Sequence, residues 1–335
     1  MTKKRIGIAL GAIILLLAAA GIYIAIQHDY DMKEQVIEID TPEGKLTGTF
    51  VLPKSYDGKL GLVLFIHGDG PIDATHSGGY RPLWERLASL GYASLSIDKR
   101  GINGSEGNWE HQSMEDRMTE ARRAMAWAKK QPMIDGHRIG AWGASQAGWV
   151  IPKLAGEEQL TFSILVSPAV NWVEQGRYHT RAHRKKAGLS DEEIDKALAY
   201  DKQVLELLER QSSYEDYLKI ADEQRAMSKD RWLFAGKNYM ADSTEELSHF
   251  KSPVLLLLGE KDIHVDIKDT EQVYREKIDP QLLDVTVFQN TEHSMLSVKT
   301  ANSELRALWI SVLAPRQITV PAYMDRIEQF LRQLP

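Results

Sequence analysis

Short apolar runs recur along this chain, and helical patterns separate most of them. The runs read GLVLFIHG, ASLSID, RIGAWGAS, FSILVSPA and SPVLLLLGE, and a last strand pattern, DVTVFQN, follows. Continuous apolar runs of this length are typical of strands that are buried on both faces. Helical patterns such as YRPLWERLASLGY, DIKDTEQVYREKI and PAYMDRIEQFLRQL lie between or after them. This alternation predicts an α/β fold with a doubly wound, mostly parallel sheet.

Two alternating segments precede the sheet pattern, and one long segment interrupts it. QVIEID and KLTGTFVLP, joined by the turn TPEG, are expected to pair as antiparallel strands. Residues 171–248 show no convincing strand, and Ser190 with Glu193 forms a capping box that starts a helix. Because strands of one sheet flank this segment, we expect an inserted helical cap over the carboxyl ends of the strands, where ligands bind.

The N-terminus carries a long apolar segment without charge. Basic residues at positions 3–5 precede residues 6–26, which as a helix would span about 31 Å, the hydrocarbon thickness of a bilayer. We expect a single-pass transmembrane signal anchor in the cell membrane, with the rest of the chain outside the cytoplasm. The alternatives are a signal peptide cleaved after residues 18–20, which gives a secreted protein, and a buried core helix. The expected layout is a cytoplasmic tip, an anchor, a linker and the α/β domain with its inserted cap, at 1–5, 6–26, 27–34 and 35–335.

Composition excludes several classes of partner and chemistry. The 335-residue chain has a formal net charge of −6 and no long basic run, which argues against a nucleic-acid partner. It has no cysteine, so disulfides, thiol nucleophiles and cysteine zinc sites are excluded. Neither GxGxxG nor GxxxxGK[ST] occurs, and no His/Asp/Glu cluster has metal-ligand spacing. We therefore expect neither a metal nor a cofactor.

A serine between small residues follows the strand RIGAWGAS, in the stretch GASQAG (143–148). Ser145 would stand on a strained turn that projects its hydroxyl, and the N–H groups of the following helix would stabilise an oxyanion. Ala147 occupies the position of the last glycine in the G-x-S-x-G form of this motif. The alternative is an ordinary glycine-rich turn between a strand and a helix.

A serine nucleophile needs a histidine to take its proton and a carboxylate to orient that histidine. LLLLGEKDIHVD places Asp262 just past a buried strand, and VTVFQNTEHSML places His293 just past the last strand. The chain order serine, aspartate, histidine is the one expected for this architecture. Asp266 is the alternative acid, although it stands where a helix cap is expected. His264 is too close to Asp262 to serve as the base.

The glycine-rich turn FIHGDGPIDATHSGG follows another apolar strand. We expect the backbone N–H of Asp69, or that of Gly68, to pair with the N–H of Gln146 as an oxyanion hole. The Asp69 carboxylate should then face away from the oxyanion, and His67 should brace the loop through hydrogen bonds. The alternative is a flexible surface loop.

The predicted cap would decide which substrates fit. His179 and His183 in this segment are expected at the surface, and its acidic residues fit solvated helix faces better than a site for a substrate amine. Four aromatic residues are candidates for lining an acyl pocket, or alternatively for the core of the cap: Trp172, Trp232, Phe234 and Tyr239.

Five segments in order give the chain a resemblance to the α/β-hydrolase superfamily: IHGDGP, DKRGINGSEG, GASQAG, LGEKDIHVD and EHSML. The similarity covers residues 35–335 apart from most of the cap. It implies Ser145 as nucleophile, Asp262 as acid and His293 as base. DKRGINGSEG is similar to the family's D-x-R-G-x-G-x-S-x-G turn, with Asn103 at one glycine position. The likeness is greatest to esterase, acyl-thioesterase and prolyl-aminopeptidase branches with helical caps.

The sequence therefore predicts a serine hydrolase that cleaves carboxylic esters through an acyl-enzyme on Ser145. An aminopeptidase, an amidase or an acyl-thioesterase on the same residues is the alternative, and a non-catalytic binding module is a third hypothesis. The expected partners are a small acyl ester or short peptide as substrate and a membrane bound through the N-terminal helix.

Overall fold

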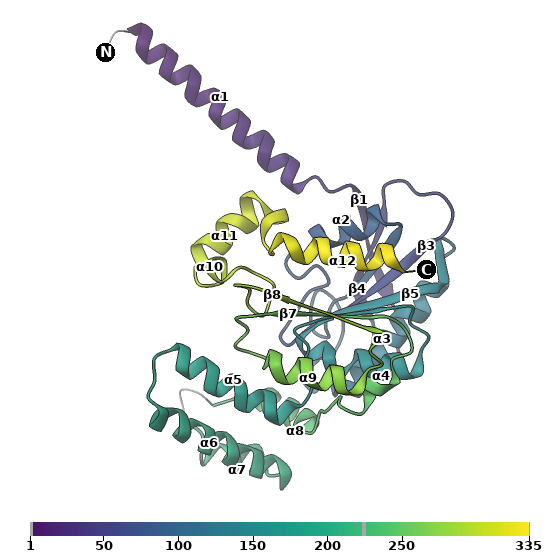
Figure 1. Ribbon diagram of the computed structural model, residues 1–335, viewed down its shortest axis with the longest axis vertical. Helices are drawn as coiled ribbons and strands as arrows, with labels where there is room; N and C mark the ends of the chain where they lie inside the picture. Colours follow the sequence, from purple (N-terminus) through teal and green to yellow (C-terminus); the bar gives the residue numbers. More distant parts are fainter. Residues whose placement is uncertain (1–2, 223–225, 335) are drawn as a thin grey trace.

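One mixed sheet with helices on both faces organises the protein (Figure 1). The computed structural model describes residues 3–222 and 226–334, without the side chains of 3–10 and 12. Within these residues the strands lie in the order β1-β2-β4-β3-β5-β6-β7-β8. The β1–β2 and β2–β4 pairs are antiparallel and the remaining pairs are parallel, as the sequence predicts. The strands are Met32–Ile39 (β1), Leu46–Pro53 (β2), Leu60–Ile66 (β3), Tyr92–Ile97 (β4), Ile134–Ala144 (β5), Ser163–Val166 (β6), Val254–Gly259 (β7) and Leu283–Phe288 (β8).

Burial along the strands explains their sequence patterns. The inner strands β3 and β7 are buried at every position, which requires apolar side chains on both faces of the sheet. The edge strand β1 is exposed at most positions between its buried ends. The carboxyl ends of the parallel strands meet at one edge of the sheet, where the site loops follow them.

Helices cover the two faces of the sheet and build two separate hydrophobic cores. α2 and α12 pack on one face, with Trp84 and Phe330 in the core there. α3, α4 and α9 pack on the other face, with Met125, Leu154 and Tyr274 in the second core (Figure 1). These helices are Arg81–Ser89 (α2), Met114–Lys129 (α3), Ile151–Glu157 (α4), Ile267–Lys277 (α9) and Pro321–Gln333 (α12).

The predicted insertion between β6 and β7 is helical over its described part. Ser190 and Glu193 form the predicted capping box at the start of α6. A small core of its own holds these helices together, with Tyr217 and Trp232 stacked at 4.7 Å. The helices are Trp172–Lys186 (α5), Asp191–Glu209 (α6), Tyr214–Leu218 (α7), Lys229–Asn238 (α8) and the 3-10 helix Glu246–His249 (η3).

A second helical segment joins β8 to α12. It consists of Val298–Ala301 (α10), Glu304–Leu313 (α11) and the 3-10 helix Pro315–Gln317 (η4). The C-terminal end of α1 packs against α11 and η4, and Figure 1 shows the rest of α1 pointing away from them.

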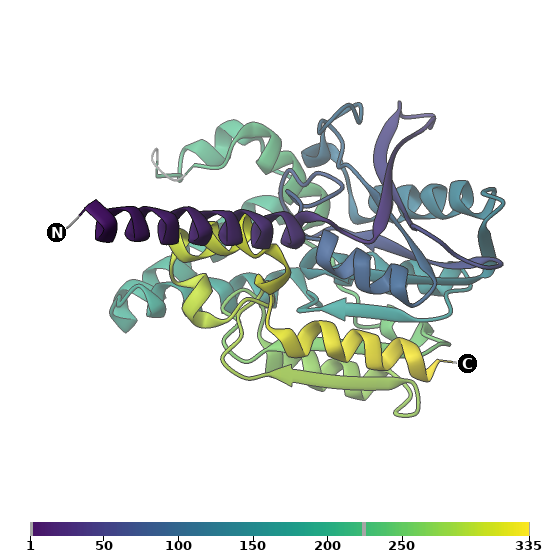
Figure 2. The ribbon, with the colours of Figure 1, turned by 90° about the horizontal axis from the view of Figure 1, so that it is seen from above.

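Residues 6–26 lie within one long helix, α1 (Lys3–His28), which extends away from the sheet (Figures 1 and 2). Its described apolar side chains, such as Leu15 and Leu16, are exposed. Among the side chains that the structure describes, no helix is long and apolar enough to cross a membrane. The predicted helix is therefore confirmed, whereas the structure gives no support to the predicted transmembrane span over 6–26.

Candidate active site

Ser145 stands on a strained turn directly after β5. Its φ is +54°, in the left-handed region that a residue other than glycine rarely adopts. A Cβ at Gly143 would lie 2.5 Å from the Ala147 Cβ and 3.0 Å from the Ile66 carbonyl oxygen, so the turn requires glycine at 143. Ala147 itself is fully buried and its methyl group fills this space. The small residues around Ser145 are therefore a steric requirement of the turn.

The helix expected after Ser145 is divided into two. A 3-10 helix (η2, Ser145–Trp149) comes first and α4 begins at Ile151. Pro152 lacks an N–H and fits only the first turn of a helix, so α4 has to start there.

Asp262 and His293 come together although they follow different strands. His293 Nδ1 lies 2.7 Å from Asp262 Oδ2, and the other carboxylate oxygen accepts the backbone N–H groups of His264 and Val265. Burial raises the pKa of Asp262, but the hydrogen bond and charge of His293 and the two N–H groups outweigh it, so the pKa lies below its usual value. The carboxylate is thus ionised and holds the imidazole in one orientation.

Ser145 and His293 line the same cavity of about 870 Å³. Gly68 and Asp69 of the β3 loop line it too. A Cβ added to Gly68 would lie 3.2 Å from the Ser145 Cβ and 3.9 Å from its hydroxyl oxygen, so the loop backbone passes directly beside the serine. The structure therefore brings the predicted nucleophile, base and oxyanion loop to one place.

Two buried cations hold the oxyanion loop in position. Lys99 Nζ donates to the Gly68 carbonyl at 2.5 Å, and Arg117 donates to the His67 carbonyl and, at 3.0 Å, to Gln146 Oε1. In a trans peptide the next N–H points opposite to the carbonyl, so these contacts turn the Gly68 and Asp69 N–H groups away from the cations. Burial and the neighbouring Arg117 charge lower the pKa of Lys99 well below its usual value. Burial also lowers the pKa of Arg117, to about 10.

Sequence reasoning missed Lys99 and Arg117. Lys99 lies in the DKRGINGSEG turn, whose likeness to the family motif assigns no role to the lysine. Its neighbour Arg100 braces the same turn by donating to the Glu43 and Glu106 carbonyls. The one available signal for Arg117 was its position in α3, where it shares a face of the helix with apolar residues that are buried.

The polar side chains in and near the oxyanion loop have partners of their own. The Asp69 carboxylate forms a two-bond pair with Arg231 of α8, at 2.7 and 2.9 Å, which ties the loop to the inserted helices. His67 is buried and bonds to the Tyr80 hydroxyl and the Ile97 carbonyl. Asp266, the alternative acid, caps α9 by accepting two backbone N–H groups. Asp262 is the carboxylate that contacts His293.

Two further histidine rings lie next to His293. The His264 ring centroid lies 4.8 Å from that of His293 with the rings tilted at 45°, and His179 of α5 stacks on His264 at 5.1 Å. Burial, followed by the charges of His293 and His179, lowers the pKa of His264 to about 4. His179 is half-buried in this stack, whereas a surface position was expected. Among the described side chains, no group of three or more His, Cys, Asp or Glu residues could hold a metal ion.

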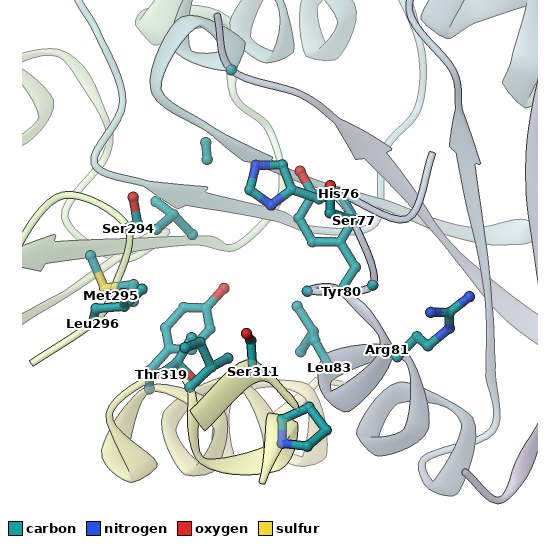
Figure 3. Close-up of a pocket in the computed structure, with 18 of the residues that line it drawn as sticks. His76, Ser77, Tyr80, Arg81, Leu83, Ser294, Met295, Leu296, Ser311 and Thr319 are labelled. Atoms are coloured by element: carbon teal, nitrogen blue, oxygen red, sulfur yellow. The ribbon is translucent and has the colours of Figure 1, made fainter. Parts of the chain in front are cut away.

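The four aromatic candidates of the insertion pack away from the cavity. Trp172 stacks on Trp149, Phe234 is buried beside Trp172, and Trp232 belongs to the core of the insertion with Tyr239 against it. The cavity lies instead between the start of α2 and the segment from β8 to α12 (Figure 3). Its apolar lining outside the oxyanion loop includes Leu83, Trp142, Val166, Met295, Leu296, Ile318 and Met324.

A serine that opens a helix at the end of a parallel strand, with an Asp–His pair after the last two strands, places the chain among the α/β-hydrolase serine hydrolases. Comparison with family models gives a narrower assignment. The model of the X-Pro dipeptidyl-peptidase (S15) family matches residues 40–295. The chain belongs to this family.

Relatives of the chain include both peptidases and esterases. Dipeptidyl-peptidase 5 of Porphyromonas gingivalis is 28% identical over 38% of this chain and 20% of its own length. A probable dipeptidyl-aminopeptidase B of Aspergillus oryzae is 31% identical over 29% of this chain and 12% of its own length. The chain therefore spans only a small part of these relatives. Esterase EstD of Thermotoga maritima is 23% identical over 80% of this chain and 62% of its own length.

Solved structures share the fold at low sequence identity. An esterase of Pyrococcus furiosus covers 90% of this chain, over 91% of its own, with a TM-score of 0.58 at 19% identity. The acylaminoacyl peptidase of Pyrococcus horikoshii covers 93% of this chain, over 43% of its own, with a TM-score of 0.57 at 16% identity. At such identities the likeness concerns the fold alone.

Proposed function

We propose that the protein hydrolyses carboxylic esters through an acyl-enzyme on Ser145. The observation that carries the proposal is the strained Ser145 turn in the same cavity as His293, whose other ring nitrogen is held by Asp262. A serine hydroxyl becomes nucleophilic when a correctly oriented imidazole can take its proton.

The residues divide the reaction as follows. Ser145 Oγ attacks the ester carbonyl while His293 Nε2 takes its proton, and the Asp262 carboxylate stabilises the imidazolium that forms. The N–H groups of Gln146 and of Gly68 or Asp69 stabilise the developing oxyanion. His293 then protonates the departing alcohol. In the second half of the reaction His293 takes a proton from water, the water attacks the acyl carbonyl, and the carboxylic acid leaves as Ser145 regains its proton.

The charges of the cavity favour an ester over a peptide with a free amine. A carboxylate without a cationic partner would favour binding of the ammonium group of an aminopeptidase substrate. The carboxylates among the described lining residues are those of Glu34 and Asp69. Glu34 is paired with Arg81 and Asp69 with Arg231, so each already has a cationic partner.

A dipeptidyl-peptidase activity is the second candidate, because the family model and two of the relatives are named for it. The same acyl-enzyme chemistry would serve an amide or a thioester. An esterase and a dipeptidyl-peptidase would differ in the substrate that the cavity binds, and a panel of substrates distinguishes the two.

The test compares the wild type with Ser145→Ala on p-nitrophenyl esters, acyl thioesters and X-Pro p-nitroanilides. We expect ester hydrolysis by the wild type and its loss in Ser145→Ala with the fold intact by circular dichroism. Preference for X-Pro anilides would favour the second candidate, and undiminished turnover by Ser145→Ala would refute both.

A location outside the cytoplasm stays a proposal that rests on the sequence alone. It depends on the basic residues at 3–5 before the apolar segment 6–26. Protease added to intact cells should then degrade the hydrolase domain, and full protection would contradict the proposal.

A further inference from the structure

α11 exposes an apolar stripe that the fold does not use. None of its residues, all of which are described, is buried. Leu305, Leu308, Trp309 and Val312 are 49–64% exposed. Their spacing of three, four and seven residues places them on one face of the helix. Contiguous apolar surface of this kind marks a site of interaction with a protein or a lipid.

The end of α1 is fastened beside this stripe. Arg316 of η4 donates to the carbonyls of Ile26 and Asp29, His28 Nε2 bonds to the Val312 carbonyl at 2.8 Å, and Gln317 donates to the Tyr23 hydroxyl. Arg316 is held in turn by Glu85 at 2.7 Å. The two helices therefore keep a fixed relation.

The last turns of α1 also expose apolar side chains. Ile22 and Ile26 are exposed and lie one helical turn apart, on one side of the helix. We call these residues, with the α11 stripe, the apolar face. Figures 1 and 2 both show the C-terminal end of α1 next to the segment that carries α11.

The cavity of Ser145 reaches the inner side of the same segment. Ser311, Pro315, Ile318 and Thr319 line it from α11, η4 and the chain that follows, and Figure 3 shows Ser311 and Thr319 on this wall. His28 and Tyr30, at the end of α1, line it as well. One segment thus forms a wall of the cavity and part of the apolar face.

The interior of the cavity suits an aliphatic chain. Leucine, isoleucine and methionine side chains line it, and two lining tyrosine hydroxyls already have partners. Tyr80 bonds to His67 at 3.1 Å, and Tyr323 accepts from Trp142 at 3.0 Å. These tyrosines need no polar group from a ligand. The volume of about 870 Å³ lies in the range of pockets that enclose a whole small ligand.

We propose that the cavity binds the acyl chain of an amphiphilic long-chain ester, which enters from a lipid surface on which the apolar face rests. This inference rests on the proposed esterase function. Long-chain esters gather in lipid phases because their chains avoid water, so an enzyme whose cavity adjoins a lipid-bound face meets them there.

The first experiment removes the stripe from the full-length protein. The variant is Leu305→Gln/Leu308→Gln/Trp309→Gln/Val312→Gln, and glutamine preserves helix propensity. The matched control is Leu218→Gln/Met240→Gln, which changes exposed apolar residues of the insertion. Substrates are 4-methylumbelliferyl butyrate in solution and the oleate ester in phosphatidylcholine vesicles.

We expect the stripe variant to lose more than about tenfold of its vesicle activity, because apolar area no longer enters the lipid. Its butyrate activity should match that of the control. Equal vesicle activity of variant and control overturns the inference. A wild type that is a dimer, together with a stripe variant that is a monomer, also overturns it, because the apolar face would then be a contact between two copies of the chain. A wild type that cleaves neither ester refutes the proposed function instead.

The second experiment narrows the cavity without touching the apolar face. Thr319→Trp should lower kcat/KM for the oleate ester at least about tenfold while acetate hydrolysis persists, because a filled pocket excludes the longer chain. Ser248→Trp, at an exposed position of η3, is the control. If Thr319→Trp does not fold, Ser311→Trp replaces it. An unchanged chain-length profile in the folded variant contradicts the assignment of the cavity.

Discussion

His293 Nδ1 lies 2.7 Å from Asp262 Oδ2 across a separation of 31 residues. β7 and β8 are parallel neighbours, so their carboxyl ends deliver the two side chains to the same edge of the sheet. With Nδ1 held by the carboxylate, Nε2 is the nitrogen left for the serine proton.

Asp262→Asn should remove this orientation. The amide would offer N–H to Nδ1 and favour the wrong tautomer, and a serine protease with the same triad on an unrelated fold loses about 10⁴-fold in kcat from such a change. Asparagine still accepts from the His264 and Val265 N–H groups, so the loop should keep its shape. Ester kinetics and thermal unfolding measure both effects, and a kcat within tenfold of the wild type would contradict the role.

Gly143→Ala should distort the Ser145 turn. The added methyl group would lie 2.5 Å from the Ala147 Cβ, and overpacking of this kind costs about 1–3 kcal/mol. Gly136→Ala is the control on β5, since its methyl group meets only Lys129 Cγ at 3.8 Å. Gly143→Ala should lower both the free energy of unfolding in denaturant and the ester activity, whereas Gly136→Ala should lower neither. Equal values for the two variants would count against the steric explanation.

Arg117→Gln should reduce kcat about 10²-fold with little change in KM, because the donors of the oxyanion hole would lose their orientation. Arg117→Lys should recover part of the rate by restoring one donor to the His67 carbonyl. Arg122→Gln, which removes an exposed pair with Glu157 on the same helix, is the control. A rise in KM at constant kcat would instead assign Arg117 to substrate binding.

The free energy of unfolding should rise with pH from about 4 to 6.5. Burial, followed by the Lys99 charge, lowers the pKa of His67 to about 3, from 6.5 in the unfolded chain. In this window the unfolded state binds more protons, so each such histidine adds a slope of up to about 1.4 kcal/mol per pH unit. His67→Gln should reduce the slope, and His137→Gln, at an exposed site, should not. A flat profile in the wild type would contradict a neutral buried His67.

The strand ends could be predicted because their physics is local. Continuous apolar runs specify buried parallel strands, and the residues after them, among them Ser145, Asp262 and His293, share one edge of the sheet. Asp266 was separable from Asp262 because its spacing to the next helix is that of a cap.

The walls of the cavity could not be predicted in this way. The aromatic residues of the insertion are apolar enough for a pocket, but only the tertiary fold decides that Trp232 packs inward. The spacing of Leu305, Leu308, Trp309 and Val312 was a readable signal for α11, whereas its contact with α1 depends on hydrogen bonds of Arg316 to backbone carbonyls, which leave no pattern in the sequence.

The most direct test of the account is the site of covalent labelling by a fluorophosphonate, mapped by peptide mass spectrometry. The account predicts one adduct, on Ser145, that is absent in Ser145→Ala and forms far more slowly in His293→Ala. Labelling of a different residue, or ester hydrolysis by a wild type that the probe leaves unlabelled at Ser145, would contradict it.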